Sequence, residues 1–447
     1  MKTIVLGAGI IGISTAWHLL ERGHEVVVVD RQPDAALETS FANAAQISVS
    51  YCEPWANREA PLKALKWMFD KEAPLLFRPQ LDWDQWRWGL KFLAQCNDTA
   101  FERNVQQIVA LGAYSHAALK DLVVSTGIEY NRLERGIAHF YTDQKSFDAA
   151  GHAVELMRKF GVQRRLVSRD ELLKIEPAFK AYGDKITGGT YTSTDESGDA
   201  RVFTQELARR CMARGAQFLY GHDVLRLNKI GNAIDSVAVM PKQTSAGGKK
   251  DFILKADAVV VACGSYSAPL LRSVGVDLPI YPGKGYSATF PLLKPEGAPM
   301  VSTIDDGKKI AMSRLGNYLR VAGTIELNGW DLTLDSSLAR ARCHMLSRRI
   351  EAILPGVCDT RTPEQGGDPQ YWTGLRPATP TNIPFIGQTR VGKLWVNAGH
   401  GTLGWTHGAG SGKALAELIS GEQPAMNFGF LGHQGSARRA SATALAA

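Results

Sequence analysis

The chain begins Met1-Lys2-Thr3-Ile4-Val5-Leu6-Gly7-Ala8-Gly9-Ile10-Ile11-Gly12. Its first six residues predict a short buried strand, the glycines spell G-x-G-x-x-G, and Ser14–Arg22 has the composition of a helix. A second predicted strand, Glu25–Val29, ends at Asp30, 18 residues after Gly12. This strand–turn–helix–strand order is the context in which the motif binds a dinucleotide, so the stretch predicts a Rossmann-like domain.

Each glycine of the motif has its own role. Gly7 permits the tight turn, Gly9 lets the backbone approach a pyrophosphate, and Gly12 lets the helix pack closely on the strand. The free N–H groups and the positive dipole end of the helix favour phosphate, and Asp30 is placed to accept a hydrogen bond from a ribose hydroxyl. The motif therefore predicts the ADP half of a dinucleotide, and by itself leaves FAD and NAD both open.

The bulk composition limits the class of protein. A chain of 447 residues predicts two domains or one large domain with insertions, and 45% hydrophobic and 21% charged residues are ordinary for a globular protein. The net charge of +7 favours anionic partners, but no Lys/Arg run marks a nucleic-acid module. The six cysteines form no C-x-x-C pair, which predicts free thiols, a reducing compartment and no metal site. No uninterrupted apolar run is long enough to predict a membrane span.

Half of the ten tryptophans fall between residues 54 and 95. This region reads as helices separated by Pro74 and Pro79. Two interpretations apply, a docking patch for a membrane or partner and a helical core layer of a second domain, and the second is favoured.

After the first strand–helix–strand unit, no further nucleotide-binding unit follows directly, and a similar glycine-rich pattern occurs only near the end of the chain. The strand Leu394–Asn397 leads into the glycine-rich loop Gly399–Gly404 and a last helix at about 409–420. A distant helix N-terminus of this kind can stabilise negative charge on a reduced flavin, so the distribution favours FAD over NAD. We expect an FAD-binding domain from 1–50, 150–280 and 370–425, a substrate domain from 51–149 and 281–369, and a disordered tail at 426–447.

Longer motifs point to a family. They are Leu37-Glu38-Thr39-Ser40 with Asn43 and Gln46-Ile47-Ser48, Pro61 to Met68, Asp195 to Asp199, Lys284-Gly285-Tyr286-Ser287, Trp372 to Pro377 and Gly399 to Thr406. On these motifs, across roughly residues 1–425, the chain resembles the FAD-dependent D-amino-acid oxidase superfamily and, within it, the bacterial D-amino-acid dehydrogenase small subunits. It departs from the family at Ala45, where glycine is usual, and in detail at His407 and Gly408–Gly412.

The resemblance implies a mixed α/β fold, in which a Rossmann-like FAD-binding domain is interleaved with an antiparallel β-sheet substrate domain. It implies oxidative deamination of a D-amino acid such as D-alanine: hydride leaves Cα for flavin N5, and the imine hydrolyses to a 2-oxo acid and ammonia. Arg376 aligns with the arginine that binds the substrate carboxylate, a role that suits a bidentate guanidinium. Tyr286 and Lys284 are weaker candidates for lining the pocket, and no general base is required. The predicted FAD contacts are Gly7, Ala8, Gly9, Ile10, Gly12, Asp30, Arg31, Thr39, Ser40, Asn43, Gln46, Ile47, Val224, Gly264, Gly399, Gly401, Thr402, Leu403 and Gly404.

Several functional alternatives stay open at this point. The first interpretation is a dehydrogenase that passes electrons to a quinone or another carrier; the second is an O₂-using oxidase of the same fold, acting on glycine, sarcosine or a related amine. The others are a flavin-binding subunit without turnover and, weakest, an NAD dehydrogenase. The expected location is cytoplasmic, with peripheral contact at the cytoplasmic face of the inner membrane as an option.

Overall fold

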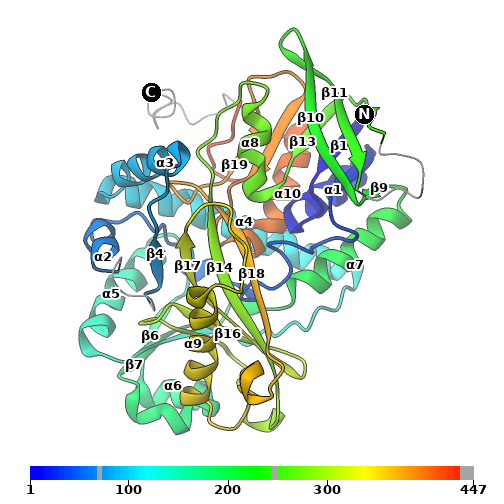
Figure 1. The fold of residues 1–447 in the computed structure, drawn as a ribbon. Helices are drawn as coiled ribbons and strands as arrows, with labels where there is room; N and C mark the ends of the chain where they lie inside the picture. The colour runs from blue at the N-terminus through cyan, green and yellow to red at the C-terminus, as the bar shows by residue number, and fades with distance from the viewer. Residues whose placement is uncertain (68–72, 243–249, 433–447) are drawn as a thin grey trace.

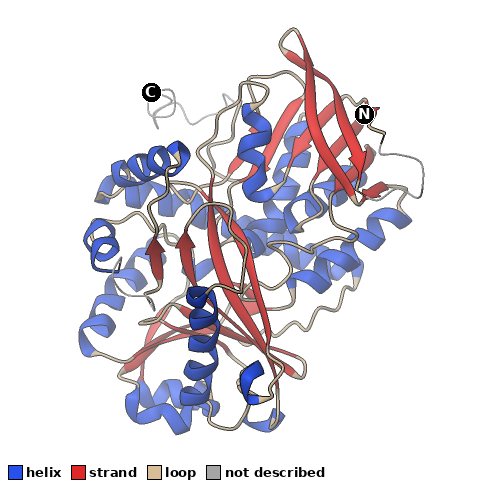
Figure 2. Cartoon of the chain, viewed as in Figure 1, coloured by secondary structure: helices blue, strands red, loops and turns tan. Residues whose placement is uncertain are grey.

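The computed structural model describes residues 1–67, 73–242 and 250–432 and is built on two large β-sheets (Figure 1, Figure 2). The first lies at the upper right of Figure 1 beside the N-terminus, with strand order β19-β20-β13-β1-β2-β9. Neighbouring strands are parallel except β19 and β20. The strands are β1 (Lys2–Leu6), β2 (Glu25–Asp30), β9 (Gln217–Tyr220), β13 (Ala258–Val261), β19 (Phe385–Gln388) and β20 (Leu394–Ala398).

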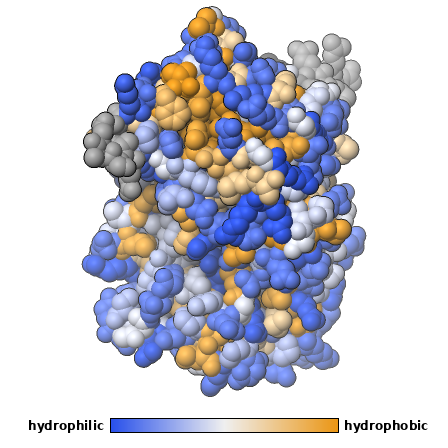
Figure 3. All heavy atoms as spheres, turned by 90° about the vertical axis from the view of Figure 1, so that its right-hand side faces the viewer, coloured by the Kyte–Doolittle hydropathy of each residue, from blue (hydrophilic) through white to orange (hydrophobic). Residues whose placement is uncertain are grey.

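Both faces of this first sheet are covered, which explains its continuous apolar strands. Val5 packs on one side among the helices, whereas Ile4 and Leu6 pack on the other side against a small antiparallel sheet. Hydrophobic residues also gather on the outer surface where that small sheet lies (Figure 3). The helices are α1 (Ile10–Glu21), α4 (Asp98–Thr126), α7 (Ala200–Ala213) and α10 (Gly404–Ile419); the small sheet is β10 (His222–Ile230), β11 (Ala233–Pro241) and β12 (Phe252–Leu254), beside α8 (Ser267–Arg272).

The second sheet runs from the centre of the molecule, where β14, β17 and β18 lie, to its lower part, where β6 and β7 lie (Figure 1). Its strand order is β18-β14-β17-β16-β15-β5-β7-β6, and β4 pairs with β17. Most neighbours are antiparallel, as expected for a substrate domain; β15–β5 and β17–β4 are parallel. The strands are β4 (Leu75–Phe77), β5 (Ile137–Tyr141), β6 (Arg165–Ser168), β7 (Gly188–Thr192), β14 (Tyr281–Pro291), β15 (Ser302–Asp305), β16 (Ile310–Leu315), β17 (Tyr318–Leu327) and β18 (Gln370–Ala378).

One face of the second sheet is closed by helices. Leu346 and Ile350 of α9 (Ser337–Ile353) pack on Phe290 and Val321 in one apolar cluster. The opposite face turns toward the first sheet. The remaining elements are α2 (Ala60–Trp67), α3 (Trp83–Ala94), α5 (Gln144–Lys159), α6 (Arg169–Ile175), β3 (Gln46–Ile47) and β8 (Glu196–Ser197).

The sheets divide the chain differently from the expected boundaries. Strands β6, β7 and β18 fall in segments expected to bind FAD, yet they pair within the second sheet. Helix α4 falls in the expected substrate segment, yet it packs in the core around α1 and α10. Strand pairing and helix packing over long sequence separations decide these assignments, and neither can be read from local composition.

The C-terminal segment is partly ordered, which corrects the expected tail at 426–447. Phe428 and Phe430 are buried in the core around α1 and α10, and Leu431 bridges to Gly387 of β19. Residues 433–447 lie outside the described residues. Within the described part of the chain, α4 is the one helix long and apolar enough to cross a membrane, but Leu111, Ala118, Leu119 and Leu122 of this helix are buried in the core.

The tryptophan-rich region has one buried side and one exposed side. Trp88 of α3 is buried, donates its indole N–H to Ala378 O (2.9 Å) and stacks on Phe92. Trp83 and Trp86 of the same helix are exposed. The favoured interpretation as a core layer therefore holds for the inner side of α3 and is wrong for its outer side.

Candidate active site

A cavity of about 1030 Å³ is lined by residues of both sheets. It extends from Gly7 and Gly9 of the opening motif to Gly285 and Arg376 of the second sheet, and the loop Gly399–Gly404 forms part of its wall. This size is sufficient for a dinucleotide together with a small substrate.

The opening motif has the close contacts that its glycines predict. Gly7 adopts φ +106°, and a Cβ there would lie 2.5 Å from the carbonyl oxygen of Ala262 in the neighbouring strand. A Cβ at Gly12 would overlap the carbonyl oxygen of Gly7. Gly9, which precedes α1, supplies no side-chain cap, and Ser40 takes only the N–H of Ile10, so the amides of Ile11 and Gly12 remain available to a phosphate.

Asp30 ends β2 at the edge of the cavity. Its two carboxylate oxygens accept hydrogen bonds from the backbone N–H groups of Ala8 (2.6 Å) and Gln32 (2.8 Å). Burial raises the pKa of Asp30, and these two hydrogen bonds oppose the rise. The residue is thus held where a ribose hydroxyl would meet it, and the ribose contact itself stays a prediction.

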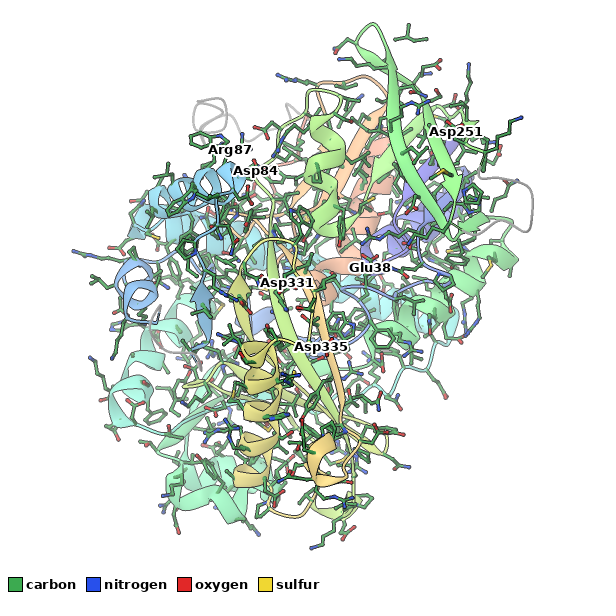
Figure 4. All side chains as sticks on the ribbon, in the orientation of Figure 1. Glu38, Asp84, Arg87, Asp251, Asp331 and Asp335 are labelled. Carbon is green, nitrogen blue, oxygen red and sulfur yellow. The ribbon has the colours of Figure 1, made fainter. Side chains whose placement is uncertain are left out.

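The segment after β2 folds back over the motif. Ser40 Oγ accepts from the N–H of Ile10 (3.1 Å). Arg31 pairs with Glu38 (2.5 Å), which is labelled in Figure 4, and its guanidinium lies 3.8 Å from the ring centroid of Tyr266. Tyr266 was not predicted, because an isolated tyrosine carries no sequence signal for stacking on a distant arginine.

The second glycine-rich loop joins the same cavity. Gly399 adopts φ +91°, and Leu403 precedes α10 without a side-chain cap, which leaves the first helical amides available. Asn397 Oδ1 and His400 Nε2 are buried atoms that have no hydrogen-bond partner among the described residues, and both residues line the cavity. Burial holds the pKa of His400 well below its usual value, so the ring is neutral at neutral pH. Unsatisfied polar atoms beside open helix amides indicate a polar ligand at this position.

Arg376 is the principal charged group at the other end of the cavity. Its guanidinium donates to Thr324 O (3.0 Å), and no carboxylate within residues 1–67, 73–242 and 250–432 pairs with it. Burial lowers the pKa of Arg376 to about 10, which leaves it charged at neutral pH. A Cβ at Gly285 of β14 would overlap the guanidinium, so only glycine leaves room for it. A cation without an anionic partner in a cavity wall is suited to bind an anion.

Thr324 is held in a strained conformation beside this arginine. The pairing of β14 with β17 shifts by one residue at this point, so Thr324 is the extra residue of a bulge. Its φ is +55°, an uncommon value for a β-branched residue, and its buried hydroxyl has no partner among the described residues. The bulge turns the Thr324 carbonyl toward Arg376, as strained backbone often does at functional sites.

Lys284 and Tyr286 lie on the opposite face of β14 from Arg376. Lys284 Nζ donates to Thr333 O (2.6 Å) and pairs with Asp331, which precedes α9 and is labelled in Figure 4. Tyr286 donates to Glu326 (2.6 Å) and packs in the cluster under α9, although part of the residue still lines the cavity. Alternate residues of a strand share a face, so the two point the same way. Lys284 is not among the residues that line the cavity.

The structure brings most of the other predicted FAD contacts together. Ala8, Gly12 and Ile47 support the wall from behind and do not line it. Ala45 adopts φ +60°, in the left-handed region that glycine adopts without steric cost. This agrees with the glycine that is usual at this position in the family. The predicted contacts that line the cavity are Gly7, Gly9, Ile10, Asp30, Arg31, Thr39, Ser40, Asn43, Gln46, Val224, Gly264, Gly399, Gly401, Thr402, Leu403 and Gly404.

Charged residues missed by sequence reasoning line the cavity near Arg376. Asp306 and Lys309 come from the turn between β15 and β16, whereas Glu53 and Arg164 come from two other loops, and no local motif links the three segments. Elsewhere in the described chain, no three His, Cys, Asp or Glu side chains gather as a metal would need.

Comparison with known proteins identifies the family. The model of a family described as "FAD dependent oxidoreductase" matches residues 2–418. The chain belongs to this family. A D-amino acid dehydrogenase of Dechloromonas aromatica is 49% identical over 431 residues, covering 96% of this chain and all of the relative. One of Granulibacter bethesdensis is 41% identical and covers 95% of this chain and 97% of the relative.

Solved structures share the fold. A glycine oxidase from Geobacillus kaustophilus superposes with a TM-score of 0.70 over 95% of this chain and 96% of the other, at 20% identity. An L-proline dehydrogenase from P. horikoshii gives 0.69 over 94% of each chain, at 18% identity. The predicted family, fold class and FAD cofactor are confirmed, and the residues present fit the cofactor: the close glycines, the two open helix ends and the orphaned atoms of Asn397 and His400 surround one cavity.

Proposed function

We propose that this family member is a D-amino acid dehydrogenase, which deaminates D-amino acids such as D-alanine oxidatively to 2-oxo acids and ammonia. The observation that carries the proposal is the unpaired guanidinium of Arg376 in the cavity that holds the FAD-binding motifs. A substrate carboxylate would supply the negatively charged partner that Arg376 lacks. The names of the relatives that match nearly the whole chain support the same activity.

The protein's main task in this reaction is positioning. FAD, when bound, supplies the two-electron acceptor chemistry. Arg376 fixes the substrate carboxylate, Thr324 O orients Arg376, and Gly285 leaves room for it. Holding the substrate in one pose provides much of the rate acceleration, because orientation is settled before the reaction.

No described side chain is needed as a general base. The substrate amine can lose its proton to solvent, and Lys284 is turned away from the cavity toward Asp331 and Thr333. The pH–rate profile of Lys284→Ala should therefore keep its basic limb while FAD stays bound. Loss of that limb with FAD retained would contradict this part of the proposal.

Within the same proposal, the electrons pass to a quinone or another carrier rather than to O₂. We propose a cytoplasmic location for the protein, with peripheral contact at the inner membrane. The outer side of α3 supports the contact: Trp83, Trp86, Leu90 and Leu93 are exposed at helical spacing, and Lys91 is exposed beside them. Exposed tryptophan and leucine side chains with a lysine beside them are typical of helices that lie in the surface of a bilayer.

The position of α3 is fixed from its other sides. Asp84 pairs with Arg272, and Arg87 pairs with Asp277; Asp84 and Arg87 are labelled in Figure 4. Vesicles containing anionic lipid should therefore bind the protein, and Trp83→Ser with Leu90→Ser should weaken the binding. Val124→Ser, which removes an exposed apolar side chain of α4, is the matched control.

The decisive test is anaerobic bleaching of the yellow flavin across a panel of D- and L-amino acids. Bleaching by D-alanine and not by L-alanine is expected. Absence of bleaching by any amino acid would leave a flavin-binding subunit without turnover. Stoichiometric peroxide under air would identify an oxidase instead of a dehydrogenase.

A further inference from the structure

A second group of charged side chains lines the cavity close to Arg376. Lys309 Nζ pairs with Asp306 (2.8 Å), and Arg164 pairs with Glu53 (3.0 Å). All four residues line the same cavity as Arg376. The side chain of Lys309 is 43% accessible and that of Glu53 is 28% accessible, whereas that of Arg164 is 2% accessible. The group therefore offers both an ammonium and a carboxylate to a molecule in the cavity.

The pairing of the second sheet places Lys309, one member of this group, close to the backbone that holds the arginine. Ile310 pairs with Gly323, so Lys309 stands next to Thr324, whose carbonyl holds Arg376. Adjacent strands lie roughly 5 Å apart, a distance that an amino-acid side chain can span. Two positions further along the same strands, the small residues Ala311 and Ala322 pair with each other and also line the cavity.

The second ion pair, Arg164 with Glu53, is held in place by further hydrogen bonds. Arg164 also donates to Thr190 Oγ1 (3.1 Å), Ser50 O (3.3 Å) and Tyr141 Oη (3.3 Å). These contacts use the guanidinium fully and hold Glu53 in place. Lys309 adopts φ +52°, so two adjacent positions, Lys309 and Thr324, are both held in the left-handed region. Strain of this kind is kept where the surrounding structure needs one fixed geometry.

We infer that this charged wall, formed by Glu53, Arg164, Asp306 and Lys309, is the subsite for the side chain of the D-amino acid, and that it selects a carboxamide, as in D-glutamine or D-asparagine. The inference rests on the proposed function, because Arg376 must hold the carboxylate for the side chain to point this way.

The balance of charge in the wall accounts for the choice of a carboxamide. The two cations and two anions already neutralise one another, so a charged side chain would lose hydration without gaining an unpaired opposite charge. A carboxamide both donates and accepts, and it can bond to a carboxylate oxygen and to the ammonium at once. An aliphatic side chain of the same length would keep both ion pairs but would exclude water from the remaining hydrogen-bonding positions of Lys309 and Glu53 without replacing it.

The test compares kcat/KM for D-glutamine with kcat/KM for D-norleucine, using an artificial dye as acceptor so that the natural acceptor does not matter. The wild-type enzyme should prefer D-glutamine to D-norleucine, D-glutamate and D-lysine. Lys309→Met should lower the ratio for D-glutamine over D-norleucine about tenfold, the effect expected for one hydrogen bond to a charged group. Glu53→Gln tests the second pair in the same way and covers the case in which Lys309→Met does not fold.

Lys308→Met is the matched control, because this neighbouring lysine of the same turn does not line the cavity. It should leave the ratio unchanged. An unchanged ratio in every folded variant, or a wild-type preference for D-glutamate or D-lysine, would overturn the inference. Flavin bleaching by D-amino acids separates this failure from failure of the proposed function, since bleaching would persist.

Discussion

The two ends of the cavity are built by different physical means. The nucleotide end consists mainly of backbone: glycines that bring chain segments into contact, and two helix starts that present backbone amides to the cavity. The substrate end consists of charged side chains from one strand and three loops, which the fold brings to the wall of one cavity. The nucleotide end tolerates few added side-chain atoms, because its backbone segments are in contact. The function of the substrate end depends instead on which charged side chains pair with each other and with the substrate.

The largest effect is expected where the backbones are closest. Gly12→Ala would push a methyl group into the Gly7 carbonyl and separate α1 from β1. We expect purified protein without FAD and without activity, since the motif no longer presents its amides to the pyrophosphate. Flavin absorbance per mole of protein measures this. Gly89→Ala on α3, where a Cβ meets nothing within 4 Å, should retain full flavin content.

At the substrate end, the unpaired cation should matter for turnover and leave the cofactor in place. Arg376→Leu removes the partner of the substrate carboxylate and should lower kcat/KM for D-alanine by about 10²- to 10³-fold. Arg376→Lys should recover only part of the loss, because one ammonium does not replace a bidentate guanidinium. Loss of FAD from Arg376→Leu would show that the two ends are not independent.

Much of the nucleotide end could be predicted, because its contacts follow the chain locally. One stretch of thirty residues contains the strand, the motif, the helix and Asp30. The substrate end could be predicted only at Arg376. Lys284 and Tyr286 are two apart in a strand, so their sharing of a face was foreseeable, but which face meets the cavity depends on the bulge at Thr324. Lys309 and Glu53 reach the same cavity through the packing of distant segments, which no local pattern encodes.

Gly285 tests whether the substrate end also depends on backbone space. Gly285→Ala would displace the Arg376 guanidinium, and misplacement alone should lower kcat/KM on the order of 10- to 100-fold, mainly through KM. Ser287→Ala, which removes a buried hydroxyl with no partner in the described chain, is the control on the same strand. Equal activity of the two variants would show that Arg376 can move without loss.

A buried histidine in the first turn of α10 gives the nucleotide end a predictable pH dependence. Burial lowers the pKa of His407 from 6.5 to about 3. The unfolded chain therefore binds this proton at higher pH than the folded chain does, and stability falls as pH drops below 6.5 toward 3, by about 1.4 kcal/mol per pH unit for one histidine. Urea unfolding at several pH values should show a shallower loss in His407→Gln. An unchanged slope would assign the loss to other buried groups, such as His139.

The smallest effect is expected at the strained loop next to the nucleotide end. Ala45 adopts φ +60°, and its N–H donates to Asn43 Oδ1 (2.9 Å). Glycine at this position removes a steric cost of about 1–2 kcal/mol but adds freedom to the unfolded chain, so Ala45→Gly should stabilise the fold by less than about 1 kcal/mol. Ala42→Gly, in the same loop without a positive φ, should instead destabilise by about 0.5–1 kcal/mol. If urea unfolding shows equal losses for both variants, the Ala45 backbone carries no strain and the loop is held by its hydrogen bonds alone.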